Sequence, residues 1–142
     1  MGFEVFQKSS APLAKVPSVT IQRRGLLSIN RSAWAELGEP EAVELLFDRE
    51  SQVIGLRPVD VKSPNAYPVR PQVAGSDKGP LLVAGQLFTQ YYRIDTTQAR
   101  RYIDPKVVDG IMHIDLKTGG QLVSSNRSRA PRSSDEGGDG AV

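Results

Sequence analysis

The chain has 142 residues, which is enough for one domain or for two very small ones. It contains no cysteine, and this excludes disulfides, thiolate chemistry and zinc sites that need sulfur. No run of the sequence approaches the roughly 18 apolar residues of a membrane span, and the short, polar start is unlike a signal peptide. We therefore expect a cytoplasmic protein with no membrane contact.

The net charge is only +2, but the charged residues are segregated along the chain. Residues 1–38 carry five basic and two acidic side chains, and residues 61–103 carry six basic and two acidic ones. Between them, residues 39–60 carry two basic and six acidic side chains. Such segregation can place one basic face on a nearly neutral protein, as in domains that bind nucleic acid. Ordinary solvated charge on all faces is the alternative interpretation.

A flexible arm is expected over residues 1–17, followed by two strands. Val19 and Ile21 would face one side of the first strand, and their polar neighbours would face the other. Residues 26–29 form a second short strand. The segment Arg23-Arg24-Gly25 between them is typical of a turn, because glycine tolerates backbone conformations that other residues avoid.

A short helix and a hairpin are predicted next. Asn30 is placed to cap a helix over residues 31–37, since its side-chain oxygen can accept from an amide of the first turn. Gly38 ends that helix in the left-handed conformation. Trp34 is interpreted as an anchor that holds the helix on the sheet. Residues 42–59 then alternate as a β-hairpin.

Composition divides the rest of the chain. Residues 61–80 are rich in proline and glycine, and they predict a linker between a first module at residues 18–60 and a second at residues 81–117. Residues 118–142 are rich in Gly, Ser and charge. We expect this tail to be disordered, because it has too little apolar surface to bury.

The second module is predicted to be rich in β-structure as well. A strand is expected over residues 81–84. The segment Asp95-Thr96-Thr97-Gln98 has the form of a capping box and predicts a helix over residues 99–103. Residues 107–116 then form a strand or a hairpin, with Asp109-Gly110 as the turn.

The two modules are also interpreted as diverged copies of one unit. At an offset of 65, the segment Ile29-Asn30-Arg31-Ser32 aligns with Ile94-Asp95-Thr96-Thr97. In each segment an isoleucine ends a strand, a polar cap follows, and a short helix is expected. A chance match of two strand–helix–strand patterns is the alternative.

The sequence lacks the residue constellations of an enzyme. Its one histidine, His113, lies two residues before Asp115, so the two side chains would share a strand face. No Ser, Glu or second His forms a recognisable partner motif with them. There is no phosphate-binding glycine loop and no calcium-loop spacing. We predict a binding protein with no catalytic residues, no metal and no cofactor.

One stretch resembles a known family. It comprises the basic turn with its two strands, residues 19–31, then Trp34-Ala35-Glu36-Leu37-Gly38, then the hairpin end Gly55-Leu56-Arg57-Pro58. This pattern is similar to the AbrB/SpoVT (MazE-like) swapped-hairpin DNA-binding domain, over about 40 residues of the chain. The family's proline after the second strand is Asn30 here. The resemblance implies a mainly β fold with short helices, and two repeats would be similar to the MraZ branch.

The resemblance also implies a function and a site. It implies a regulator of transcription or an antitoxin that binds duplex DNA through basic residues around the first turn. Arginine suits this role because its planar fork can bind a phosphate or a guanine edge. Carried onto this sequence, the DNA-binding residues are Gln22, Arg23, Arg24, Asn30 and Arg31, with Lys15 as an auxiliary contact.

Two other functions stay open. The arm and the tail, in which arginines precede acidic residues, would suit a β-rich module that docks on a protein partner. Residues 25–34 are also similar to part of the single-stranded-DNA-binding transcriptional coactivator fold, so single-stranded nucleic acid is a further candidate.

Assembly follows from size. A unit of ~40 residues has too small a core to stand alone. We expect residues 18–59 to pair either with residues 81–116 or with the same segment of another chain, and we favour a homodimer.

Overall fold

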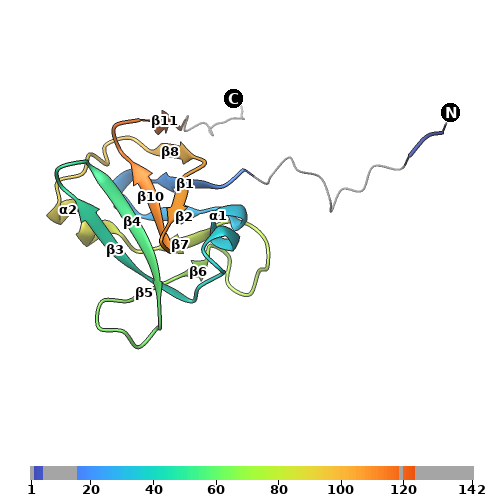
Figure 1. Ribbon diagram of the computed structural model, residues 1–142, viewed down its shortest axis with the longest axis horizontal. Coiled ribbons are helices and arrows are strands. Elements are labelled where there is room, and N and C mark those ends of the chain that lie inside the picture. The colour runs from blue at the N-terminus through green and yellow to red at the C-terminus, as the bar shows by residue number, and fades with distance from the viewer. Residues whose placement is uncertain (1, 5–15, 119, 124–142) are drawn as a thin grey trace, which may run out of the picture.

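The computed structural model describes residues 2–4, 16–118 and 120–123, and it is built from two antiparallel sheets (Figure 1). The six-stranded sheet has the order β11 (Gly120–Leu122), β8 (Arg100–Ile103), β1 (Ser18–Ile21), β2 (Leu27–Ile29), β7 (Leu81–Val83), β6 (Arg70–Pro71). The five-stranded sheet has the order β5 (Tyr67–Pro68), β3 (Ala42–Asp48), β4 (Val53–Val59), β10 (Ile111–Asp115), β9 (Lys106–Val108).

Two short helices and one 3-10 turn complete the described part of the chain. They are α1 (Arg31–Glu36), α2 (Gln86–Tyr91) and η3 (Arg23–Gly25). Neither helix is long or apolar enough to cross a membrane. The predicted fold class, mainly β with short helices, is confirmed.

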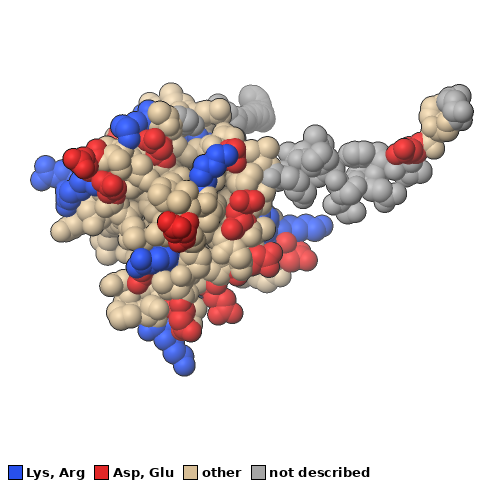
Figure 2. All heavy atoms as spheres, in the orientation of Figure 1, with Lys and Arg blue, Asp and Glu red and all other residues tan. Residues whose placement is uncertain are grey.

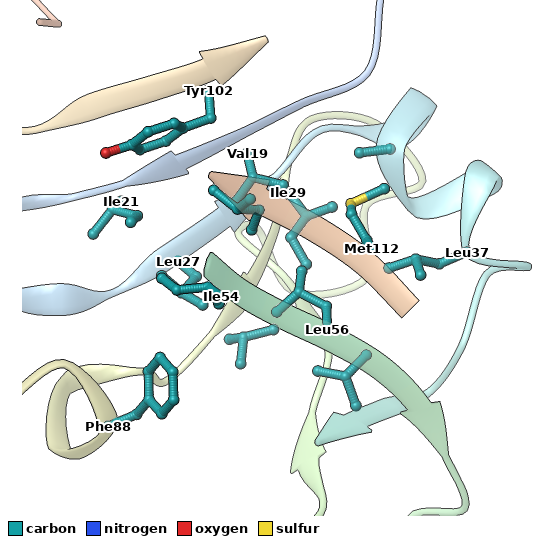
Figure 3. Close-up of a cluster of buried hydrophobic side chains, with 14 residues drawn as sticks. Val19, Ile21, Leu27, Ile29, Leu37, Ile54, Leu56, Phe88, Tyr102 and Met112 are labelled. Carbon is teal, nitrogen blue, oxygen red and sulfur yellow. The ribbon is translucent and has the colours of Figure 1, made fainter. Parts of the chain in front are cut away.

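The core lies between the two sheets (Figure 3). The alternation predicted for β1 is present, since Val19 and Ile21 are buried while Thr20 between them is only half-buried. Burying one such aliphatic side chain stabilises the fold by about 1.5–3 kcal/mol. The largest fully buried side chains come from both sheets: Leu27, Ile29, Val19 and Val83 from one, and Ile54, Leu56, Met112, Ile114 and Val43 from the other.

The hairpin predicted over residues 42–59 is confirmed, and residues 107–116 form a hairpin, which is one of the two alternatives expected there. The strands β1 and β2 pair around η3, and β3 pairs with β4 along seven residues each. The strands β9 and β10 pair around Asp109-Gly110, whose φ angles of 53° and 77° are both positive. Positive φ at both central residues is typical of the tight turns that match the twist of paired strands.

The segment expected as a linker belongs to both sheets. Within residues 61–80, β5 pairs with β3 and β6 pairs with β7. The two expected modules also share sheets, because β1 pairs with β8, β2 with β7, and β4 with β10. Residues 18–59 are therefore completed by the second half of the same chain, which is one of the two pairings expected. The homodimer stays a prediction.

The helix predicted over residues 99–103 is wrong. Residues Arg100–Ile103 form β8, which pairs with β1 on one side and with β11 on the other. The alignment of the two halves at an offset of 65 is wrong for the same reason, because it would match the helix α1 to residues that include the start of the strand β8. Each half does contain a strand followed by a six-residue helix, in β2–α1 and β7–α2.

The sequence predicted that regular structure ends at Lys117, but one more strand follows. Residues Gly120–Leu122 form β11 on the edge of the six-stranded sheet. A Cβ at Gly120 would lie 2.8 Å from Cε2 of Tyr102, so the backbone of β11 lies directly on that ring. The rest of the expected tail, residues 124–142, lies outside the described residues, as does most of the expected arm, residues 5–15.

This contact predicts different effects for two truncations. A chain that ends at Thr118 loses β11 and uncovers Tyr102, which is 7% exposed. We expect its melting temperature to fall by about 5 °C, the shift that ~1 kcal/mol produces in a domain of this size. A chain that ends at Val123 should have the same melting temperature as the full chain, as measured by calorimetry. Equal melting of both truncations would show that β11 contributes nothing to stability.

Candidate nucleic-acid interface

The basic turn between β1 and β2 is held by backbone hydrogen bonds. The amide of Gly25 donates to the carbonyl of Gln22 at 2.9 Å, and the amide of Gln22 donates to Leu26 at 2.8 Å. The amide of Arg24 donates to the carbonyl of Thr96 at 3.3 Å, although Arg24 has a φ of 73°. The side chains of Arg23 and Arg24 are exposed. A fixed backbone thus presents two guanidinium groups to solvent.

The turn also packs tightly on α2. Gly25 has a φ of 99°, and a Cβ there would lie 2.2 Å from Oγ1 of Thr89 and 3.1 Å from Cα of Gln86. Thr89 is 1% exposed, and its hydroxyl donates to the carbonyl of Gln86 at 3.0 Å. A Cβ at Gly85 would in turn lie 2.9 Å from the carbonyl oxygen of Gly25. Two glycines therefore allow the turn to sit directly on the start of the helix.

The outer face of the six-stranded sheet continues from this turn. In the register, Thr20 of β1 lies opposite Ser28 of β2 and opposite Arg101 of β8. Two hollows on this face share these three residues. Because Thr20 and Ser28 are short, the sheet surface beside Arg101 is depressed. We call this surface, from the turn to α1, the basic groove.

The two ends of the basic groove differ in charge. Gln22, Arg23 and Gln98 line the end near the turn, and no acidic side chain is among the described residues that line it. The end near α1 is mixed: Arg31 and Lys78 lie there with Glu39 and Asp77. Positive charge is therefore concentrated at the turn end. On the face drawn in Figure 2, over β3 and β4, acidic and basic side chains are intermingled.

Three guanidinium groups at the turn end have no acidic partner. Within the described part of the chain, Arg23, Arg24 and Arg101 form no ion pair and no side-chain hydrogen bond. Arg100 differs, since its Nη1 lies 3.5 Å from Oδ2 of Asp95. The pKa of Asp95 is lowered, first by the hydrogen bond from the Thr97 hydroxyl and then by the Thr97 amide and Arg100. The unpaired arginines keep all their donors available to a ligand.

Asn30 caps α1 and ties it to β1. Its Oδ1 accepts from the amide of Ala33 at 2.8 Å and from the amide of Ser18 at 3.0 Å, and its Nδ2 donates to the carbonyl of Val16 at 2.8 Å. The predicted cap is confirmed. These bonds engage both polar atoms of the side chain at the end of β2 opposite the turn.

Arg31 holds a neighbouring loop. Its Nε donates to the carbonyl of Gly79 at 2.8 Å, and its Nη2 lies 3.2 Å from the carbonyl of Ser76 and 3.4 Å from that of Lys78. The guanidinium carbon also lies 5.3 Å from the centroid of the Trp34 ring, a cation–π contact. Arg31 is therefore engaged within the chain.

The structure thus brings only part of the predicted site together. Gln22 and Arg23 line the turn end, and Arg24 follows them in the turn but lines neither hollow, whereas Asn30 and Arg31 lie at the α1 end. Lys15 lies outside the described residues. Sequence reasoning missed Arg101, although the Arg100-Arg101 pair and the basic balance of residues 61–103 were a signal. Arg101 reaches the groove only because β8 pairs with β1.

The described residues that line the groove offer hydrogen-bond donors and positive charge. Among the described residues, no three His, Asp or Glu side chains lie close enough together to hold a metal ion. No family model, curated protein or solved structure matches this chain.

Proposed function

We propose that this chain binds duplex DNA, without catalysis, through the turn end of the basic groove. The observation that carries this proposal is a set of three unpaired guanidinium groups, those of Arg23 and Arg101, which line the turn end, and that of Arg24, which is exposed in the same turn. Arginine contacts to phosphates supply most of the affinity in such interfaces, and they position the protein on the helix. Gln22 and Gln98 lie beside them, and their amides can donate to and accept from base edges. A regulator of transcription or an antitoxin would act in this way.

Duplex DNA is favoured over single-stranded nucleic acid by the chemistry of the sheet face. Single strands are bound by stacking their bases on aromatic side chains within a basic groove. The described residues that line the basic groove include no aromatic side chain. The groove therefore suits contacts to a phosphate backbone better than contacts to unstacked bases.

Salt dependence tests the proposal. Each neutralised phosphate releases counterions, so log K should fall with log salt at a slope of about −0.9 per contact. We expect replacement of Arg23, Arg24 and Arg101 together by Ala to weaken duplex binding and to flatten the slope by roughly 2.7. Fluorescence anisotropy with a labelled duplex, at salt concentrations from about 50 to 200 mM, measures both.

A matched control removes three positive charges from the five-stranded sheet and from the turns that follow β4 and β10. Replacement of Lys62, Lys106 and Lys117 by Ala should leave the slope unchanged. Arg31→Ala should also keep the slope, because that side chain is engaged by the loop at residues 76–79. If the unmodified chain binds no duplex at low salt, or binds single strands more tightly, the function proposed is wrong. If the triple arginine variant keeps its slope, the placement of the site is wrong.

A further inference from the structure

A second hollow lies on the other side of α2, against the five-stranded sheet. It runs between α2, β3 and the chain before β5, and we call it the aromatic groove. Its large apolar and aromatic lining residues are Leu45, Tyr67, Leu87, Phe88, Tyr91 and Tyr92. It is separate from the basic groove, because Thr89 of the same helix packs under the basic turn.

The aromatic groove combines a fixed floor with exposed walls. The ring of Tyr92 lies 4.8 Å from that of Phe47 and 5.2 Å from that of Phe88, between centroids. Leu87 and Tyr91 are 74% and 71% exposed. Exposed apolar side chains gathered around a concave surface mark an interaction site. The rings of the floor pack in or against the hydrophobic core, so an occupant would find the surface already formed.

One cation lies beside the aromatic groove. The guanidinium carbon of Arg49 is 4.8 Å from the ring centroid of Tyr92 and 5.9 Å from that of Tyr91. Arg49 forms no ion pair within the described part of the chain. A suitable occupant is therefore apolar, with one acidic side chain.

The start of this chain has that chemistry. The sequence Phe3-Glu4-Val5-Phe6 places three large apolar residues around one acid. Phe3 is 97% exposed, so its ring has no partner within the described residues of its own copy.

We propose that residues 3–6 of one copy occupy the aromatic groove of a second copy. Phe3 and Phe6 would lie against the rings of the groove, and Glu4 would pair with Arg49. If residues 3–6 of each copy bind in the aromatic groove of the other copy, the two identical contacts form a closed dimer with two-fold symmetry.

The length of the chain between residues 6 and 16 favours binding of residues 3–6 in the groove of a second copy over binding in the groove of the same copy. The chain enters the fold beside α1, where Val16 lines the basic groove, whereas the aromatic groove lies at α2 on the opposite side of the body (Figure 1). Ten residues from Phe6 to Val16 span at most about 35 Å. A domain of this size has a radius of gyration near 13 Å, so a path around its surface is about 50 Å.

Sedimentation of the full chain over a concentration series tests this. We expect a reversible equilibrium between monomer and dimer that shifts to dimer as the concentration rises. The arm variant, Phe3→Ser with Phe6→Ser, and the groove variant, Leu87→Ser with Tyr91→Ser, should each be monomeric to at least tenfold higher concentration. The control, Val73→Ser with Val108→Ser, replaces residues that are 63% and 50% exposed elsewhere, and it should dimerise normally.

A mixing experiment identifies the occupant. The arm variant keeps an intact groove, and the groove variant keeps an intact arm, so a mixture at high concentration should form a heterodimer through one contact, more weakly than the unmodified dimer, although neither variant self-associates. Far-UV circular dichroism checks that both variants are folded. An unmodified chain that is monomeric at every concentration overturns the proposal. So does a dimer that persists in the arm variant, or a mixture that stays monomeric. None of these outcomes depends on DNA binding.

Discussion

Replacement of Gly25 by alanine is expected to lower the free energy of unfolding by about 2–5 kcal/mol. Two costs combine. A residue with a side chain at positive φ costs roughly 1–2 kcal/mol, and forcing a methyl group into a filled site costs a further ~1–3 kcal/mol. The site is filled, because the new Cβ would lie 2.2 Å from Oγ1 of Thr89 and 3.1 Å from backbone of α2. Urea denaturation of both proteins measures the difference.

Gly38 provides a matched control. Its φ of 87° is also positive, but no atom of the described residues lies within 4 Å of where its Cβ would be. Gly38→Ala should therefore show the backbone cost alone, about 1–2 kcal/mol. A second variant, Gly25→Ala with Thr89→Ala, should recover part of the steric cost in a double-mutant cycle. Equal losses at Gly25 and Gly38 would contradict the tight contact between the turn and α2.

Replacement of Trp34 by alanine is expected to cost about 3 kcal/mol, the lower end of the range for buried aromatic residues, because Trp34 is half-buried. Its ring packs on the core, and its Nε1 donates to the carbonyl of Pro40 at 2.9 Å. The variant also removes the surface on which the guanidinium of Arg31 stacks. Thermal or urea denaturation gives the loss.

Trp34→Phe separates packing from hydrogen bonding. Phenylalanine keeps most of the ring contact and loses the bond to Pro40, so we expect a loss of about 1 kcal/mol. A Trp34→Ala variant as stable as the Trp34→Phe variant would mean that the ring contributes little, and the interpretation of Trp34 as the anchor of α1 would be wrong.

The secondary structure that the sequence predicted correctly depends on neighbours in the chain. The β1–β2 hairpin follows from the alternation around Val19 and Ile21 and from a glycine that accepts positive φ. The cap at Asn30 follows from a side chain that reaches the amide of Ala33, three residues on. Each of these signals spans a few residues, so no knowledge of the fold is needed to read it.

Residues 95–103 show where local signals fail. Asp95 does accept from Thr97, through the amide at 2.9 Å and the hydroxyl at 2.6 Å, so the polar side chain forms a turn as its type favours. The helix expected next does not follow. The segment instead completes the open edge of β1, and pairing along four residues with a distant strand outweighs a weak helical preference.

The sequence by itself determined a cysteine-free, mainly β chain, its three hairpins, the cap of α1 and the exposed basic turn, because these depend on composition and on contacts between close neighbours. Only the tertiary structure decided that residues 61–80 join both sheets, that β11 covers Tyr102, that Arg31 is engaged by a loop, and that Arg101 lies beside the turn. Each of these depends on strands or loops far apart in sequence, and their pairing is set by which sheet edges remain open once the core has formed.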